Sequence, residues 1–153
     1  MLCFLIHVTD PVTAFHVYRP YNTPSKRMYT VTFVRYSLNQ GIGYNHNTGK
    51  FTAKHDGIYY FAAQLRNEYF INAKISVYLY HYHATRRQTN IKATTIGYSQ
   101  IGTQIGAWYT RQLGGSLQAV VQLKAHHQVW VGIVANDKVK LNHHSYFNGF
   151  LLA

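Results

Sequence analysis

Histidine is the residue type with the greatest potential for chemistry in this chain, because ten of its 153 residues are histidines. Three pairs stand close together in the sequence: His81 and His83, His126 and His127, and His143 and His144. On a β-strand, residues two apart point to the same face about 7 Å apart, so His81 and His83 could share one zinc or copper ion. Adjacent histidines would need a turn or a bulge to do so. The alternative is that all of them are surface residues of turns and loops.

The net charge gives a second indication of function. Lys and Arg number 15 against 4 acidic residues, which gives a formal charge of +11. Polyanionic partners such as acidic glycans, lipopolysaccharide, anionic lipid or nucleic acid are therefore plausible, although the charge is also compatible with a merely soluble cationic surface. The basic residues are scattered along the chain and form no nucleic-acid-binding motif, so no specific nucleic-acid partner is expected.

Sequence motifs of enzymes are missing. The glycines at Gly41 and Gly43 lack the third glycine of a dinucleotide loop, and there is neither a P-loop nor a Gly-x-Ser-x-Gly motif. Cys3 is the single cysteine, which excludes an intrachain disulfide and a cysteine-based metal site. We therefore expect no enzyme and no certain cofactor.

Apolar residues alternate with polar ones along most of the chain, which predicts β-strands. These strands would position the side chains described above. In the segment 116–125, Leu117, Val121 and Leu123 fall on one face. The same pattern predicts strands at 29–34, 57–65, 74–80, 128–135 and 145–153. Turn signals at 47–49, 56–57 and Gly114-Gly115 separate such strands. Many short strands between turns indicate an all-β antiparallel sandwich or barrel.

The chain has the length of one domain. Its first eight residues, MLCFLIHV, are apolar but too few to span a membrane. We interpret residues 1–11 as an N-terminal extension or the remnant of a signal peptide, with an edge strand as the alternative, and residues 12–153 as one globular domain. No membrane span is expected.

A family pattern extends across the middle of the chain. Seven residues follow the order F-x5-N-x4-Y-x6-F-x5-G-x-Y-x-F: Phe33, Asn39, Tyr44, Phe51, Gly57, Tyr59 and Phe61. This order resembles the signature of the C1q domain, the globular head of complement C1q, which is itself similar to the tumour necrosis factor fold. Segments 14–15, 129–131 and 145–152 resemble other strands of the same domain.

The resemblance implies a fold and a mode of action. The fold would be a ten-stranded antiparallel jelly-roll sandwich that assembles as a homotrimer. Tyr59, Phe61, Phe147 and Phe150 would fill its core or its trimer contact. The implied function is lectin-like pattern recognition in innate immunity by a secreted, extracellular protein without catalysis. Calcium is a recurrent ligand of the family, but with four acids and only Asp137 in an expected apical loop, a strong calcium site is improbable.

Ligand contacts are expected in loops at one end of the sandwich. Basic side chains there could give charge-assisted hydrogen bonds to carboxylate or sulfate, and the candidates are Arg86, Arg87, Lys138, Lys140 and His143. Tyr82 or Trp108 could stack on a sugar. The expected partners are anionic or sialylated glycans and microbial surface polysaccharides. The alternatives are an extracellular structural, matrix or metal-binding protein with a C1q-type trimeric head, and a receptor ligand resembling the cytokine-like relatives.

Overall fold

The computed structural model describes residues 12–21, 28–66, 75–82, 94–101, 103–105, 110–112, 114–135 and 140–153. These residues form thirteen strands and no helix. The strands are β1 (Ala14–Pro20), β2 (Met28–Thr30), β3 (Phe33–Gln40), β4 (Tyr44–Asn45), β5 (Lys50–Thr52), β6 (Gly57–Arg66), β7 (Ile75–Tyr82), β8 (Thr94–Ile101), β9 (Thr103–Ile105), β10 (Thr110–Gln112), β11 (Gly114–Leu123), β12 (Gln128–Ala135) and β13 (Tyr146–Leu151).

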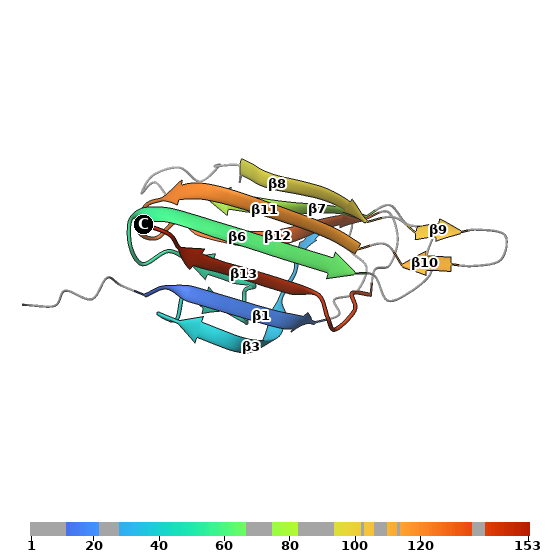
Figure 1. The fold of residues 1–153 in the computed structure, drawn as a ribbon, viewed down its shortest axis with the longest axis horizontal. Coiled ribbons are helices and arrows are strands. Elements are labelled where there is room, and N and C mark those ends of the chain that lie inside the picture. Colours follow the sequence, from blue (N-terminus) through green and yellow to red (C-terminus); the bar gives the residue numbers. More distant parts are fainter. Residues whose placement is uncertain are drawn as a thin grey trace, which may run out of the picture.

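The long strands form two antiparallel layers (Figure 1). One is a five-stranded sheet with the order β11-β6-β13-β1-β3. The other has the order β4-β5-β12-β7-β8, with β2 also paired to β12, and β9 and β10 pair separately. The predicted antiparallel sandwich is therefore confirmed. The number of strands differs from the expected ten. Eight of the thirteen strands are six to ten residues long, and the other five are only two or three residues long: β2, β4, β5, β9 and β10.

One predicted turn is wrong. Gly114 and Gly115 begin β11, where they pair with Arg66 and Leu65 of β6. The two glycines continue the ladder because β6 extends to Arg66, so that pairing partners are present up to that point.

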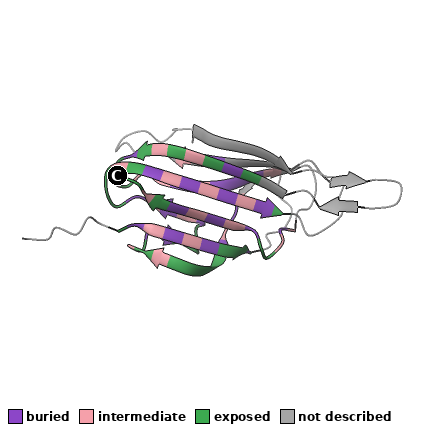
Figure 2. Cartoon of the chain, viewed as in Figure 1, coloured by how far each residue is buried: buried purple, intermediate pink, exposed green. Residues whose placement is uncertain are grey.

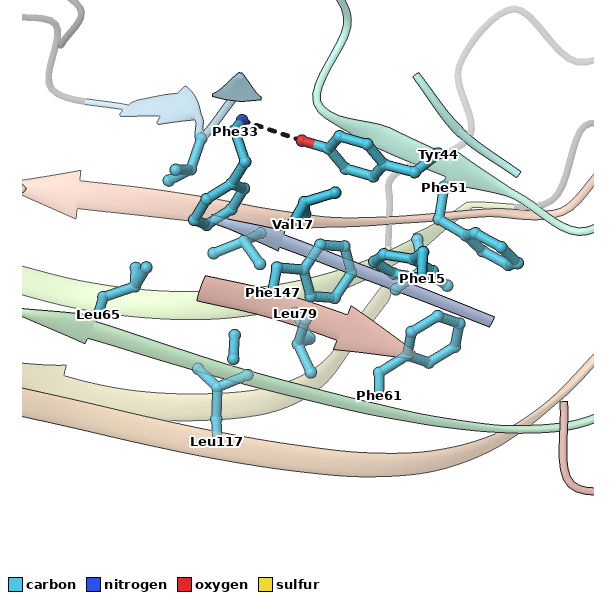
Figure 3. Packing of buried hydrophobic residues seen from close by; sticks show 14 of the residues in the cluster. Phe15, Val17, Phe33, Tyr44, Phe51, Phe61, Leu65, Leu79, Leu117 and Phe147 are labelled. Carbon is cyan, nitrogen blue, oxygen red and sulfur yellow. Dashed lines mark hydrogen bonds between the residues drawn. The ribbon is translucent and has the colours of Figure 1, made fainter. Parts of the chain in front are cut away.

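The core lies between the two sheets and is rich in aromatic rings (Figure 3). Along β6, buried side chains alternate with more exposed ones, as the colours of Figure 2 show. Tyr59, Phe61 and Phe147 are fully buried in this core. Phe150, in contrast, is 41% exposed on the outer surface of the five-stranded sheet and takes no part in the core.

The residues of the family pattern hold the turn between β3 and β5. The Asn39 side chain accepts a hydrogen bond from the Tyr44 backbone N–H at 3.3 Å and donates one to the Tyr44 carbonyl at 3.2 Å. The Tyr44 hydroxyl in turn accepts a hydrogen bond from the Phe33 N–H at 3.0 Å (Figure 3). Burial raises the pKa of Tyr44 to about 12, so its hydroxyl stays neutral. The pattern therefore describes the scaffold rather than a binding site.

Candidate anion-binding site

Arg19 lies near the end of β1 in a backbone conformation that L-residues rarely adopt. Its φ angle is 57°, in the left-handed region. The strain is increased because Arg19 precedes Pro20, and a residue before proline favours extended conformations. Pairing on both sides holds it in place, since Tyr18 pairs with Arg35 and Pro20 pairs with Phe33 of β3. Backbone strain of this kind costs about 1–3 kcal/mol and is found most often at functional sites.

The turn before β13 presents two histidines to solvent. The Asn142 side-chain oxygen accepts a hydrogen bond from the His144 N–H at 2.8 Å, and its carbonyl accepts one from the Ser145 N–H at 2.9 Å. Ser145 is fully buried, and its hydroxyl accepts a hydrogen bond from the Arg66 N–H at 2.9 Å. The turn is therefore fixed to the end of β6, which leaves His143 and His144 exposed at its corner.

These two elements enclose a hollow of about 530 Å³, lined by Tyr18, Arg19, His143 and His144, which we call the Arg19 hollow. It lies where β1 ends and β13 begins, and both of these strand ends are toward the right of Figure 1. The two imidazole rings are 4.0 Å apart between centroids, and Tyr18 is 38% exposed. The four lining residues that the structure describes are all basic or aromatic. A guanidinium can hold a carboxylate or sulfate through two parallel hydrogen bonds, and imidazole N–H groups can add to them.

A second hollow, of about 640 Å³, lies at the other end of the sandwich. Its lining is mostly apolar with one carboxylate: Val12, Thr13, Ala14, Asp56, Phe150, Leu151, Leu152 and Ala153. The larger volume does not make it the better anion site, because the one charged side chain among its described lining residues is the Asp56 carboxylate.

Of the five predicted ligand-binding residues, two lie within the described residues and three lie outside them. His143 lines the Arg19 hollow, and Lys140 is half-buried shortly before the same turn. Arg86, Arg87 and Lys138 lie outside the described residues, as do Asp137 and Trp108. For Tyr82 the structure gives only the backbone, at the end of β7.

Tyr18, Arg19 and His144 are not among the predicted ligand-binding residues. His144 could have been found as the neighbour of His143. For Arg19, the only signal in the sequence is a basic residue immediately before a proline.

Only one member of the predicted pair of His81 and His83 lies within the described residues. His83 lies outside the described residues, whereas His81 contacts His127, with 3.1 Å between Nε2 of His81 and Nδ1 of His127. His126 and His127 lie in the connection between β11 and β12, where His126 has a φ of 74°. Among the described residues, His, Cys, Asp and Glu form no group of three or more that could hold a metal ion.

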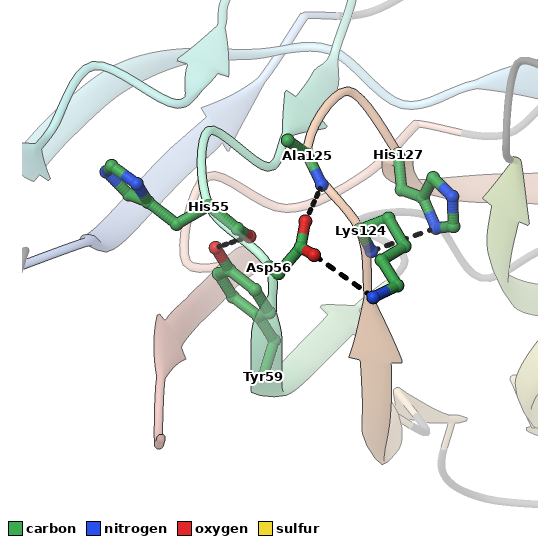
Figure 4. A network of polar contacts seen from close by, with 6 residues as sticks. All are labelled: His55, Asp56, Tyr59, Lys124, Ala125 and His127. Carbon is green, nitrogen blue, oxygen red and sulfur yellow. Dashed lines mark hydrogen bonds and ion pairs between the residues drawn. The ribbon is translucent and has the colours of Figure 1, made fainter.

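The connection that carries His127 is attached to the loop before β6 (Figure 4). The Asp56 carboxylate accepts hydrogen bonds from the Ala125 N–H at 2.8 Å and from the Lys124 ammonium at 3.0 Å. These two bonds, the one from Ala125 first, lower the pKa of Asp56. Tyr59 adds a hydrogen bond from its hydroxyl to the His55 carbonyl at 2.8 Å. Hydrogen bonds therefore link the two loops at this edge of the sandwich.

The outer surface of the five-stranded sheet is unusually apolar. Val120 is 64% exposed, Ile58 42% and Phe150 41%, and the rings of Tyr60 and Phe150 lie 5.2 Å apart. Near its centre, Oδ1 of Asn148 is buried, and within the described part of the chain no hydrogen-bond partner reaches it. We call this surface the outward face. Large exposed apolar surfaces commonly mark interaction sites.

Comparison with known proteins gives consistent matches. A family model described as the C1q domain matches residues 14–152. The globular domain of zebrafish complement 1qA protein is similar in structure, with a TM-score of 0.67, 22% identity, and coverage of 93% of this chain and 98% of that chain. Murine APRIL is similar at a TM-score of 0.65 and 15% identity, covering 92% of this chain and 99% of that chain.

A tumour necrosis factor from S. frugiperda, Eiger, is similar at a TM-score of 0.66 and 15% identity, with 94% of both chains covered. The predicted jelly roll is confirmed by these likenesses. No curated protein matches the sequence. Over the part of the chain that the structure describes, no helix is long and apolar enough to cross a membrane.

Proposed function

Because the chain belongs to the C1q domain family, we propose that it is a secreted, homotrimeric recognition protein that binds acidic carbohydrate in the Arg19 hollow without catalysing a reaction. Family membership indicates a recognition or signalling protein of the C1q and tumour necrosis factor type. The observation that carries the more specific proposal is the gathering of Tyr18, Arg19, His143 and His144 around one hollow.

The chemistry of the hollow favours an acidic sugar over a neutral one. The carboxylate of a sialic acid or a sulfate ester would receive hydrogen bonds from Arg19, with the imidazoles of His143 and His144 beside it. The half-exposed ring of Tyr18 offers an apolar surface for a sugar ring. The net charge of +11 would also attract polyanionic microbial polysaccharides from a distance.

The outward face supports a homotrimer as the working assembly. Val120, Ile58 and Phe150 would lose their contact with water in an interface, which is the main source of affinity between protein surfaces. A neighbouring chain could also supply the donor that Oδ1 of Asn148 lacks. Three copies would present three hollows, so weak binding at each hollow would add up to avidity on a repetitive surface.

A glycan array tests the proposal. The protein is applied to neutral, sialylated and sulfated glycans at low and high salt, because binding through exposed charges weakens with ionic strength. The test variant is Arg19→Gly, since glycine accepts a φ of 57° and the backbone is preserved. The matched control is Lys54→Ala, which removes one exposed positive charge next to Asp56, a residue of the hollow at the other end of the sandwich.

We expect saturable, salt-sensitive binding to acidic glycans that falls at least tenfold in Arg19→Gly and stays within twofold in Lys54→Ala. Equal losses in both variants would mean that only net charge matters. Binding that neither variant changes would exclude the Arg19 hollow as the site.

A further inference from the structure

We propose that His81 and His127 form a binding site for one divalent transition metal ion, Cu²⁺ or Zn²⁺. The site lies away from the Arg19 hollow and is separate from the proposed carbohydrate recognition. It rests on the direct approach of two imidazole nitrogens from different parts of the chain.

The distance between the two nitrogens is close to that required for shared ligation. Nε2 of His81 and Nδ1 of His127 are 3.1 Å apart. Two nitrogens that bind one zinc ion at 2.0–2.1 Å in tetrahedral geometry are about 3.4 Å apart. The rings therefore need to separate by only a few tenths of an ångström to admit the ion.

The protonation state of the pair is also suitable. Nδ1 of His127 accepts a hydrogen bond from the Lys124 N–H at 3.3 Å, so this nitrogen carries a lone pair rather than a proton. Nε2 of His81 must then be the donor in the contact between the rings. On metal binding, the proton of His81 moves to Nδ1 of the same ring, and the long contact from Lys124 is replaced by the metal bond.

The backbone holds both histidines in position before any ion arrives. His81 pairs with Val129 across β7 and β12. The His127 carbonyl accepts a hydrogen bond from the Ala53 N–H at 2.9 Å, and the His126 N–H donates to the Ala53 carbonyl at 2.7 Å. The Asp56 contacts described above fix the other side of the same turn. Little reorganisation is therefore required, which favours binding.

Ligand type and exposure define the class of ion. Imidazole suits copper and zinc, whereas calcium and magnesium prefer oxygen ligands. Both side chains are half-buried, so water can complete the coordination. With two protein ligands the site would be open rather than structural, and Cu²⁺ should bind more tightly than Zn²⁺.

Calorimetric titration of the full chain with Zn²⁺ tests the site, and Cu²⁺ electron paramagnetic resonance identifies its ligands. The variants are His81→Ala and His127→Ala. The control is His46→Ala, because His46 is also a histidine but is exposed in the turn after β4. Ca²⁺ serves as the ion that should not bind.

We expect one Zn²⁺ per chain in the parent protein and in His46→Ala, and at least tenfold weaker binding in each of the other two variants. The copper spectrum should show coupling to two nitrogens in the parent and to one in either variant. The melting temperature of each variant shows whether it is folded. If a variant is not folded, the copper spectrum of the parent protein alone still gives the number of nitrogens bound to the ion.

The proposal is overturned if the parent protein binds no Zn²⁺ or if binding survives both substitutions. It is also overturned if the copper spectrum shows fewer than two coupled nitrogens. None of these results bears on binding to the glycan array.

Discussion

At the scale of single residues, the Tyr44 hydroxyl has a structural role, which explains why a tyrosine stands at this position of the family pattern. It accepts a hydrogen bond from the N–H of Phe33, a residue that is fully buried. A buried donor without a partner costs about 1–3 kcal/mol, more than the net gain from a typical hydrogen bond. The phenol ring of Tyr44 also packs against the ring of Phe15, with 5.5 Å between the two ring centroids.

Tyr44→Phe should therefore lower the free energy of unfolding by about 1–3 kcal/mol, because the ring is kept while the acceptor of the Phe33 N–H is lost. Urea unfolding followed by fluorescence measures the change. Tyr36→Phe is the control, since Tyr36 is 63% exposed and should change stability by less than about 0.5 kcal/mol. Equal effects of the two substitutions would contradict this assignment.

The backbone of Arg19 gives a second prediction at this scale. Arg19→Gly should be more stable than Arg19→Ala by about 1 kcal/mol, because only glycine adopts a φ of 57° without a steric penalty. Thermal unfolding of the two variants side by side measures the difference. A more stable alanine variant would show that the left-handed conformation does not persist in solution.

At the scale of elements, the link from Asp56 to Lys124 and Ala125 connects the loop before β6 with the loop after β11. Its hydrogen bonds lower the pKa of the Asp56 carboxyl below its usual range. A carboxyl with a depressed folded-state pKa contributes stability above its unfolded pKa of about 3.9, and this contribution is lost as the pH falls through the folded value.

Asp56→Asn should accordingly be less stable than the parent protein at pH 7, and the difference should shrink as the pH falls below about 4. The effect should be modest because the carboxylate is exposed. Melting temperatures recorded between pH 7 and pH 3 provide the measurement. A constant gap across this range would mean that the charge of Asp56 plays no part.

The same scale shows which features the sequence could predict. The alternation of apolar and polar residues in β11 and the spacing of the pattern residues from Phe33 to Phe61 are local features of the sequence. Strands, turns and the family could therefore be predicted from them. The turn predicted at Gly114-Gly115 is wrong because the length of the partner strand β6 decides whether the strand pairing continues. The residues around the two glycines carry no information about that length. The contact of His81 with His127 could not be predicted for the same reason, since the two histidines are 46 residues apart and strand pairing decides whether they meet.

The Arg19 hollow could not be assembled from the sequence at all. Its two halves, at 18–19 and 143–144, lie at opposite ends of the chain, and the pairing of β1 with β13 brings them together. The left-handed backbone conformation of Arg19 could not be predicted either, because arginine has no preference for that conformation.

At the scale of the whole molecule, the outward face is the surface that the proposed homotrimer would bury. If it is the trimer contact, Val120→Lys should yield a monomer at micromolar concentration, because an unpaired ammonium in an apolar interface is strongly unfavourable. Sedimentation velocity measures the assembly. Ile42→Lys is the control, since Ile42 is 75% exposed in the turn between β3 and β4 and should leave the trimer intact.

A monomeric parent protein, or a trimer that tolerates Val120→Lys, would contradict this role for the outward face. A trimer lost in both variants would show that any added charge disrupts assembly.

The Arg19 hollow is proposed to select acidic carbohydrate, and the ratio of two affinities tests this selectivity most directly. The affinities of one sialylated glycan and of its desialylated counterpart are measured for the parent protein and for Arg19→Gly at the same ionic strength. We predict at least a tenfold preference for the sialylated form in the parent and a ratio close to one in the variant, because the guanidinium is the group that recognises the carboxylate. A preference that persists unchanged in Arg19→Gly would contradict the account.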